Sequence, residues 1–140
     1  MVIHALYVYF VFQKKKMENH NYLICLGSNS NKELNLSLAE RELSVRFPSI
    51  IFGTPMETEP LLIANPELFT NQLARFTSLL SASEIKRACK EIESLAGRMP
   101  EDKGKNIVKL DIDLLMADGK ILKPDDMERE YIKKGMEELF

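Results

Sequence analysis

An alternation of apolar and polar side chains runs through Val108-Lys109-Leu110-Asp111-Ile112-Asp113-Leu114-Leu115. Successive side chains of a β-strand point to opposite faces, so a strand here sends Leu110, Ile112 and Leu114 into the core. Asp111 and Asp113 then project side by side from the other face. Neighbouring carboxylates repel each other, and a hard divalent cation with oxygen ligands would neutralise them. We therefore predict a magnesium site on this strand.

A simpler interpretation of the same segment needs no metal. Both aspartates can face water on an edge strand, with Lys109 on the same face as an ion-pair partner for Asp111. The segment alone leaves the two interpretations open.

The bulk composition is that of one ordinary globular domain. The chain has 140 residues, 45% apolar and 29% charged, and its 19 basic and 21 acidic residues give a net charge of −2. This length can bury a sizeable core without disulfides. A charge so close to zero argues against nucleic-acid binding through bulk electrostatics, so we expect no nucleic-acid partner.

Cysteines and histidines exclude several kinds of chemistry. Cys25 lies in an apolar strand-like run and Cys89 on the apolar stripe of a predicted helix, so both read as buried hydrophobic residues. This usage suits a reducing cytoplasm. The two histidines, His4 and His20, lie at the N-terminal edge, so a Ser-His or Cys-His arrangement has no base inside the domain.

The N-terminal segment differs from the rest of the chain. Residues 1–12 are almost wholly apolar and Lys14-Lys15-Lys16 follows. The run is too short to span a bilayer as a helix and lacks the features of an export signal. We predict that residues 1–19 are an extension outside the fold, explained by an over-long gene start, and that residues 20–140 form a single domain. A weak membrane-surface anchor is the alternative; otherwise no membrane contact is expected.

Hydrophobic periodicity divides the domain into alternating elements. Apolar runs bounded by turn residues predict strands, and apolar residues at three- and four-residue spacing predict helices. Ser81-Ala82-Ser83-Glu84 forms a capping box that begins the second helix, and Asp118-Gly119 marks a turn. The predicted order is strand 22–26, helix 36–47, strand 50–52 interrupted before 56–60, strand 68–79, helix 81–97, strand 108–115 and a charged helical tail 125–140.

This order is the βαββαβ sequence of a ferredoxin-like fold. We predict an α+β architecture, with an antiparallel sheet, two helices on one face and a short C-terminal helix. The fold hosts many functions and does not by itself indicate chemistry.

Three separated segments resemble the 6-hydroxymethyl-7,8-dihydropterin pyrophosphokinase family. The first is Leu26-Gly27-Ser28-Asn29, and the second joins Glu57-Thr58-Glu59-Pro60 to Phe69-Thr70-Asn71-Gln72. The third is Gly97-Arg98 followed by the Asp111 strand. The similarity covers about residues 20 to 116.

The resemblance implies a transferase of folate biosynthesis. ATP and a dihydropterin alcohol would give the pterin diphosphate and AMP, with the protein supplying alignment and positive charge. Two Mg²⁺ ions are expected with ATP as co-substrate, and the family pattern gives their ligand role to Asp111 and Asp113. Arg98 completes the implied catalytic set.

The same resemblance assigns two binding sets. The implied pterin set is Thr58, Glu59, Leu61, Phe69, Asn71 and Tyr131. A flat heterocycle needs aromatic or aliphatic faces and a few fixed polar groups, which fits these residue types. The implied nucleotide set is Glu93, Arg98, Lys105, Lys109 and Arg129.

The chain also departs from the family pattern. Pro100, Gly104, Lys105 and Val108 stand where the family shows arginine, arginine, tryptophan and arginine, and Asp125 stands where it shows a histidine. Lysine cannot supply a planar bidentate clamp. The alternatives to an active enzyme are therefore a homologue that binds pterin without efficient transfer, and a ferredoxin-like module that oligomerises through its charged tail.

Overall fold

A computed structural model describes residues 5–6, 18–59 and 68–140. Most of the predicted N-terminal extension, and Leu61 of the predicted pterin set, lie outside the described residues. No helix among those described is long and apolar enough to cross a membrane.

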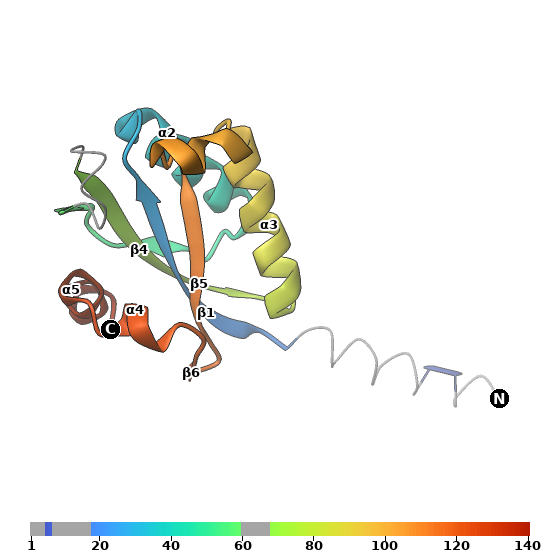
Figure 1. The fold of residues 1–140 in the computed structure, drawn as a ribbon. Coiled ribbons are helices and arrows are strands. Elements are labelled where there is room, and N and C mark those ends of the chain that lie inside the picture. The colour runs from blue at the N-terminus through green and yellow to red at the C-terminus, as the bar shows by residue number, and fades with distance from the viewer. Residues whose placement is uncertain (1–4, 7–17, 60–67) are drawn as a thin grey trace.

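An antiparallel sheet forms the middle layer of the molecule (Figure 1). Its central strand β1 (His20–Ser28) pairs with β4 (Phe69–Ser78) on one side and with β5 (Asp111–Ala117) on the other. Two short strands, β2 (Ile51–Phe52) and β3 (Met56–Thr58), pair with β4, and β6 (Lys120–Ile121) pairs with β5. This arrangement confirms the predicted α+β, ferredoxin-like class.

Two helices cover one face of the sheet, α2 (Lys32–Arg46) and α3 (Ala82–Leu95). Their apolar sides pack against alternate strand residues such as Ile24, Ala74 and Ile112. The predicted capping box is present, because the Ser81 hydroxyl accepts from the Glu84 backbone and the Glu84 carboxylate accepts from the Ser81 backbone. The apolar periodicity therefore located both helices and the face that they bury.

The opposite face carries the C-terminal helices α4 (Pro124–Met127) and α5 (Glu130–Leu139). Ile132 and Leu139 of α5 pack on Leu23 and Leu73 of the sheet. The last turn is tied to the loop after β2, since Glu138 Oε1 accepts hydrogen bonds from Thr54 N at 2.9 Å and Thr54 Oγ1 at 2.8 Å. The helical character predicted for residues 125–140 is confirmed, and the apolar side of α5 packs on the sheet, which the sequence did not predict.

Other differences from prediction are local. The segment 99–107, which the sequence left as a loop, contains the short 3₁₀ helix η1 (Pro100–Lys105). The predicted Asp118-Gly119 turn closes a hairpin, with φ of 49° and 78° at its two central residues. Positive φ at both positions is the geometry of a tight type I′ connection, which Asp and Gly favour.

Candidate active site

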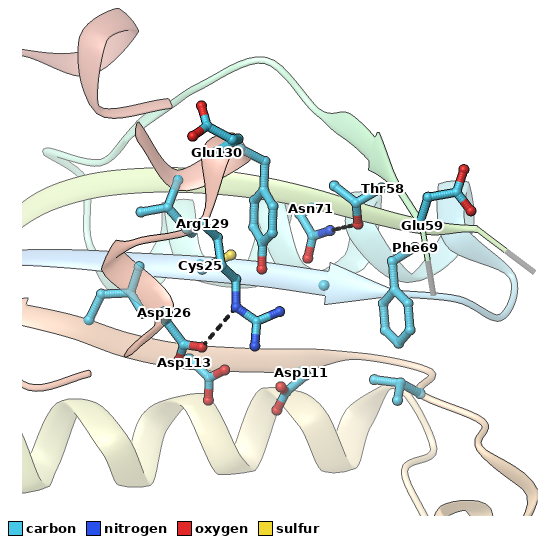
Figure 2. A pocket seen from close by; sticks show the side chains of 15 residues that line it. Cys25, Thr58, Glu59, Phe69, Asn71, Asp111, Asp113, Asp126, Arg129 and Glu130 are labelled. Atoms are coloured by element: carbon cyan, nitrogen blue, oxygen red, sulfur yellow. Dashed lines mark hydrogen bonds and ion pairs between the residues drawn. The ribbon is translucent and has the colours of Figure 1, made fainter. Parts of the chain in front are cut away.

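The strand β5 places its side chains as the alternation predicted. Leu110, just before the strand, and Ile112 and Leu114 are buried in the core beneath α2 and α3. Asp111 and Asp113 point to the other face, where both line a cavity of about 470 Å³ (Figure 2). The two carboxylates therefore share one face of the strand and open into one cavity.

The sheet register explains the floor of this cavity. Gly27 of β1 lies opposite Asp111 of β5 on one side and opposite Asn71 of β4 on the other. A Cβ added to Gly27 would lie 3.1 Å from Asn71 Oδ1. A glycine at this position therefore keeps open the space between the carboxylate and the amide.

The far wall of the cavity carries the predicted pterin residues. Asn71 is buried, and its Nδ2 donates to Thr58 Oγ1 at 2.6 Å, which fixes the amide orientation. Phe69 lies beside them at the start of β4, and Figure 2 shows its ring on the cavity wall. The members of the predicted pterin set that line the cavity are Thr58, Glu59, Phe69, Asn71 and Tyr131.

The C-terminal helices close the remaining side. Asp126 of α4 and Arg129, which precedes α5, both line the cavity. Arg129 Nε lies 3.3 Å from Asp126 Oδ1, and Figure 2 shows the guanidinium extending into the cavity. Arg129, a member of the predicted nucleotide set, is therefore paired with Asp126 and directed into this cavity.

The crowding of carboxylates changes their acidity. Burial, followed by repulsion from Asp111 and a smaller one from Asp126, raises the pKa of Asp113 to about 6, while Lys123 lowers it in part. A carboxyl group whose ionised form is disfavoured in this way is stabilised as an anion when a cation binds beside it. A positively charged ligand in this cavity would therefore stabilise the ionised form of Asp113.

Arg98 is positioned by the end of α3. Gly97 has φ 86°, and this left-handed residue turns the chain so that Gly97 N donates to Ser94 O and Arg98 N to Glu93 O. This is a Schellman motif, which favours glycine at that position. It returns Arg98 toward β5, where its Nη1 donates to Asp111 Oδ1 at 3.0 Å.

Glu93 is buried, with 3% of its surface exposed. Its Oε2 accepts from the Ile112 backbone N–H at 2.8 Å, between the two aspartates, and its Oε1 lies 3.1 Å from Arg98 Nη1. Burial raises the pKa of this carboxyl, while the Ile112 N–H and the Arg98 guanidinium oppose the rise. Glu93, a member of the predicted nucleotide set, is therefore a buried carboxylate that links α3 to β5 and to Arg98.

A second cavity of about 450 Å³ lies at the junction of α3, η1 and the start of β5. Its lining includes the cationic side chains Lys90, Arg98 and Lys103, together with Glu93 and Ser94. Val108 lines both this cavity and the one that holds the aspartates. The two spaces are therefore neighbours, with Arg98 and Asp111 beside their junction.

Two predicted nucleotide residues lie apart from both cavities. Lys109 Nζ donates to Gly97 O at 2.8 Å and lies 3.3 Å from Asp102 Oδ2, so Arg98, and not Lys109, is the cation bonded to Asp111. Lys105 is exposed on η1. Asp102 also fixes the start of the segment 99–107, because its carboxylate accepts a hydrogen bond from the Met99 backbone N–H at 3.0 Å.

Several site residues were not predicted from the sequence. Asp126 adds a carboxylate beside Asp111 and Asp113, and only its position one residue after the substituted histidine position could have pointed to it. Asn29 ends the Leu26-Gly27-Ser28-Asn29 motif, from which no role for its side chain is predicted. Its side chain accepts from Val108 N at 2.7 Å and donates to Asn106 O at 2.9 Å, so it fixes the chain that leads into β5.

The donor set fits magnesium bound together with a nucleotide. Asp111 and Asp113 supply two carboxylates, and no group of three or more His, Cys, Asp or Glu that could hold a metal occurs within residues 18–59 and 68–140. Mg²⁺ usually takes one or two carboxylates and completes its shell with water and substrate phosphates. The observed pair of carboxylates matches that requirement.

The fold and this cavity define an α+β ferredoxin-like protein whose candidate site combines paired carboxylates with aromatic side chains. A model of the 7,8-dihydro-6-hydroxymethylpterin-pyrophosphokinase family matches residues 23–140. The chain belongs to this family, which is a family of transferases of folate biosynthesis.

Similarity to individual proteins adds little to this family assignment. No curated protein matches the chain. Among solved structures, a crystal structure of a hydantoinase/carbamoylase family amidase from Burkholderia ambifaria is similar with a TM-score of 0.40 at 6% identity. The match covers 71% of this chain and 28% of that one, so the chain spans less than a third of the amidase. A likeness this low carries no information about activity.

Proposed function

We propose that this protein transfers diphosphate from ATP to 6-hydroxymethyl-7,8-dihydropterin, giving the pterin diphosphate and AMP. The observation that carries the proposal is the shared cavity, because the paired carboxylates Asp111 and Asp113 and the pterin-type residues Phe69 and Asn71 line one space. These residues come from distant parts of the chain and are brought together by its fold. The match of the chain to the pyrophosphokinase family supports the same reaction.

The reaction exchanges one P–O bond for another. The hydroxymethyl oxygen of the pterin forms a bond to the β-phosphorus of ATP, and the bond from that phosphorus to the oxygen shared with the α-phosphate breaks. AMP leaves with that oxygen, and the hydroxyl proton is released. Such transfers depend on alignment and charge neutralisation more than on covalent participation by the protein.

The pterin is assigned to the larger cavity. Its ring would lie against Phe69 and Tyr131, and its polar edge would meet the Asn71 amide, whose orientation Thr58 fixes. Aromatic faces with a few fixed polar groups are the usual composition of such pockets.

The nucleotide is assigned to the second cavity, where Lys90, Arg98 and Lys103 can meet phosphate oxygens. The shared Val108 and the adjacent Asp111 would place the reacting phosphate at the junction of the two spaces. Asp111 and Asp113 would hold magnesium, which supplies charge neutralisation on the phosphates.

Formation of AMP tests the proposal directly. Protein incubated with Mg²⁺, ATP and 6-hydroxymethyl-7,8-dihydropterin should release AMP and pterin diphosphate in equal amounts, and omission of the pterin should abolish AMP. No AMP above the enzyme-free background would rule out the transferase function.

One observation favours a second candidate, a pterin-binding protein without efficient transfer. Arg98, the arginine kept from the family motif, is held by Glu93 and Asp111, and the family arginine and tryptophan positions nearby are Pro100, Gly104, Lys105 and Val108. Both candidates bind the pterin, so AMP release separates them: saturable pterin binding without AMP release supports the binding protein.

A further inference from the structure

Arg98 contacts two carboxylates through a single nitrogen. Its Nη1 lies 3.1 Å from Glu93 Oε1 and 3.0 Å from Asp111 Oδ1. Glu93 is buried and cannot follow a movement of Arg98, because its other oxygen is bonded to the Ile112 backbone N–H. Asp111 faces the cavity. The guanidinium is therefore shared between a fixed carboxylate in the interior and a cavity-facing one.

We propose that Arg98 is a built-in counter-ion that competes with the metal ion for Asp111, and that Glu93 sets the strength of this competition. The inference rests on the proposed function, since it takes Asp111 as a metal ligand. A metal ion and a guanidinium repel each other, so metal binding at Asp111 Oδ1 shifts Nη1 toward Glu93. Glu93 then retains the arginine beside the nucleotide cavity, which Arg98 also lines.

Other nearby charges contribute less to this competition. Lys90 Nζ lies 3.8 Å from Glu93 Oε1, but the lysine side chain is 77% exposed and solvent screens it. Lys109 is bonded to Gly97 O and paired with Asp102. Arg98 is thus the cation in direct contact with Asp111 among the residues described.

The inference makes opposite predictions for two neighbouring substitutions. Arg98→Gln removes the competitor, so the affinity of the protein for Mn²⁺ should rise about three- to tenfold, the effect of one partly exposed ion pair. Glu93→Gln leaves Arg98 with Asp111 alone, so Mn²⁺ affinity should fall by a similar factor. Glutamine at position 93 still offers an oxygen to the Ile112 N–H. In the Arg98→Gln background, Glu93→Gln should change Mn²⁺ affinity by less than about twofold, because its effect passes through the arginine.

Mn²⁺ binding should be measured by electron paramagnetic resonance on the full chain without nucleotide. Two variants serve as matched controls, Arg46→Gln and Glu91→Gln. Arg46 and Glu91 form another arginine–glutamate pair, at 2.7 Å between α2 and α3, and line neither cavity. Both controls should bind Mn²⁺ as the wild type does. Thermal unfolding of every variant shows whether the fold is kept.

The outcomes separate this inference from the proposed function. Unchanged or weaker Mn²⁺ binding by folded Arg98→Gln overturns the inference, whereas AMP release by the wild type still supports the transferase. Loss of affinity on Glu93→Gln that persists in the Arg98→Gln background also overturns it. If Glu93→Gln does not fold, the Mn²⁺ affinities of Arg98→Gln and Arg46→Gln alone test the inference. Absence of Mn²⁺ binding by the wild type at millimolar metal removes the premise and overturns the inference.

Discussion

The Cβ position of Gly27 lies 3.1 Å from Asn71 Oδ1, which makes the absence of a side chain at residue 27 part of the shape of the cavity. Gly27 is also the β1 partner of Asp111. Any side chain at this position would project into the space between the carboxylate and the amide. The volume available to a flat ligand therefore depends on a residue that makes no side-chain contact.

Substitution of Gly27 should weaken pterin binding selectively. We expect Gly27→Val to reduce pterin affinity at least about tenfold, because its methyl groups fill the floor of the cavity, while a β-branched residue suits a strand backbone. Fluorescence titration with the pterin measures the effect. Gly104→Ala is the control, since a Cβ there meets nothing within 4 Å. Equal pterin affinity in wild type and Gly27→Val would show that the ring lies elsewhere.

The raised pKa of Asp113 predicts a pH-dependent stability. The folded protein holds this proton up to about pH 6, whereas an aspartate in the unfolded chain has a pKa of about 3.9. The folded state therefore binds the proton more tightly, and stability falls as pH rises through about 6. Asp113→Asn removes this loss, so at pH 8 the variant should be more stable by about 1 to 2 kcal/mol, after allowance for solvent screening.

Urea unfolding without divalent metal at pH 4 and pH 8 measures this difference. The gap between Asp113→Asn and the wild type should be small at pH 4 and open toward pH 8. A variant that is less stable than the wild type at pH 8 would show that the ionised Asp113 side chain does not destabilise the folded protein.

Asp118 should show the opposite pH dependence. Its pKa is lowered by the hydrogen bond from Asn21 N–H and by His20, whose Nδ1 lies 2.7 Å from Asp118 Oδ2. A lowered folded pKa gives stability that is present above the unfolded value and is lost as pH falls through the folded one. Asp118→Asn keeps a residue that tolerates φ 49°. The variant should be less stable at pH 7, and the difference should disappear in acid; unfolding curves at both pH values test this.

The sequence predicted most of the sheet because its signals are local. Alternation placed Leu110 and Ile112 in the core, and the capping box placed the start of α3 at Ser81. The helical character of residues 125–140 was predicted as well. The face on which α5 packs was not, because that depends on a long-range fit of Gly135 against Leu73 that no local pattern contains.

The candidate site shows the same division between local and long-range information. Alternation predicted that Asp111 and Asp113 share a face, and both line the cavity. The binding of Arg98 to Glu93 and Asp111 arises from the turn at Gly97 and the distance between α3 and β5, which only the folded chain fixes. Asp126 enters the cavity through the docking of α4, so its side chain could not be assigned from spacing.

Gly135 should control the docking of α5. A Cβ built on Gly135 overlaps Leu73 Cδ1 and lies 2.8 Å from Leu73 Cγ. Overpacking of this kind costs about 1 to 3 kcal/mol, and alanine returns about 1 kcal/mol through its higher helix propensity. We expect Gly135→Ala to lower the free energy of unfolding by up to about 2 kcal/mol. The exposed neighbour Lys134→Ala should change it by less than about 0.5 kcal/mol, as is usual for surface substitutions.

Asp111 and Asp113 should be individually required for transfer. Replacing either by asparagine keeps the shape of the side chain but removes one of the two negative charges, so magnesium-dependent AMP formation should fall at least about a hundredfold, the scale of a lost electrostatic contact in the transition state. The fold should survive, because each substitution relieves repulsion between the pair. Glu91→Gln, at the ion pair between α2 and α3, is the matched loss of a carboxylate outside the cavity and should retain activity. Full turnover by both aspartate variants, with intact circular dichroism spectra, would show that other groups hold the cation. The assignment of the reacting phosphate to the junction of the two cavities at Val108 would then be wrong.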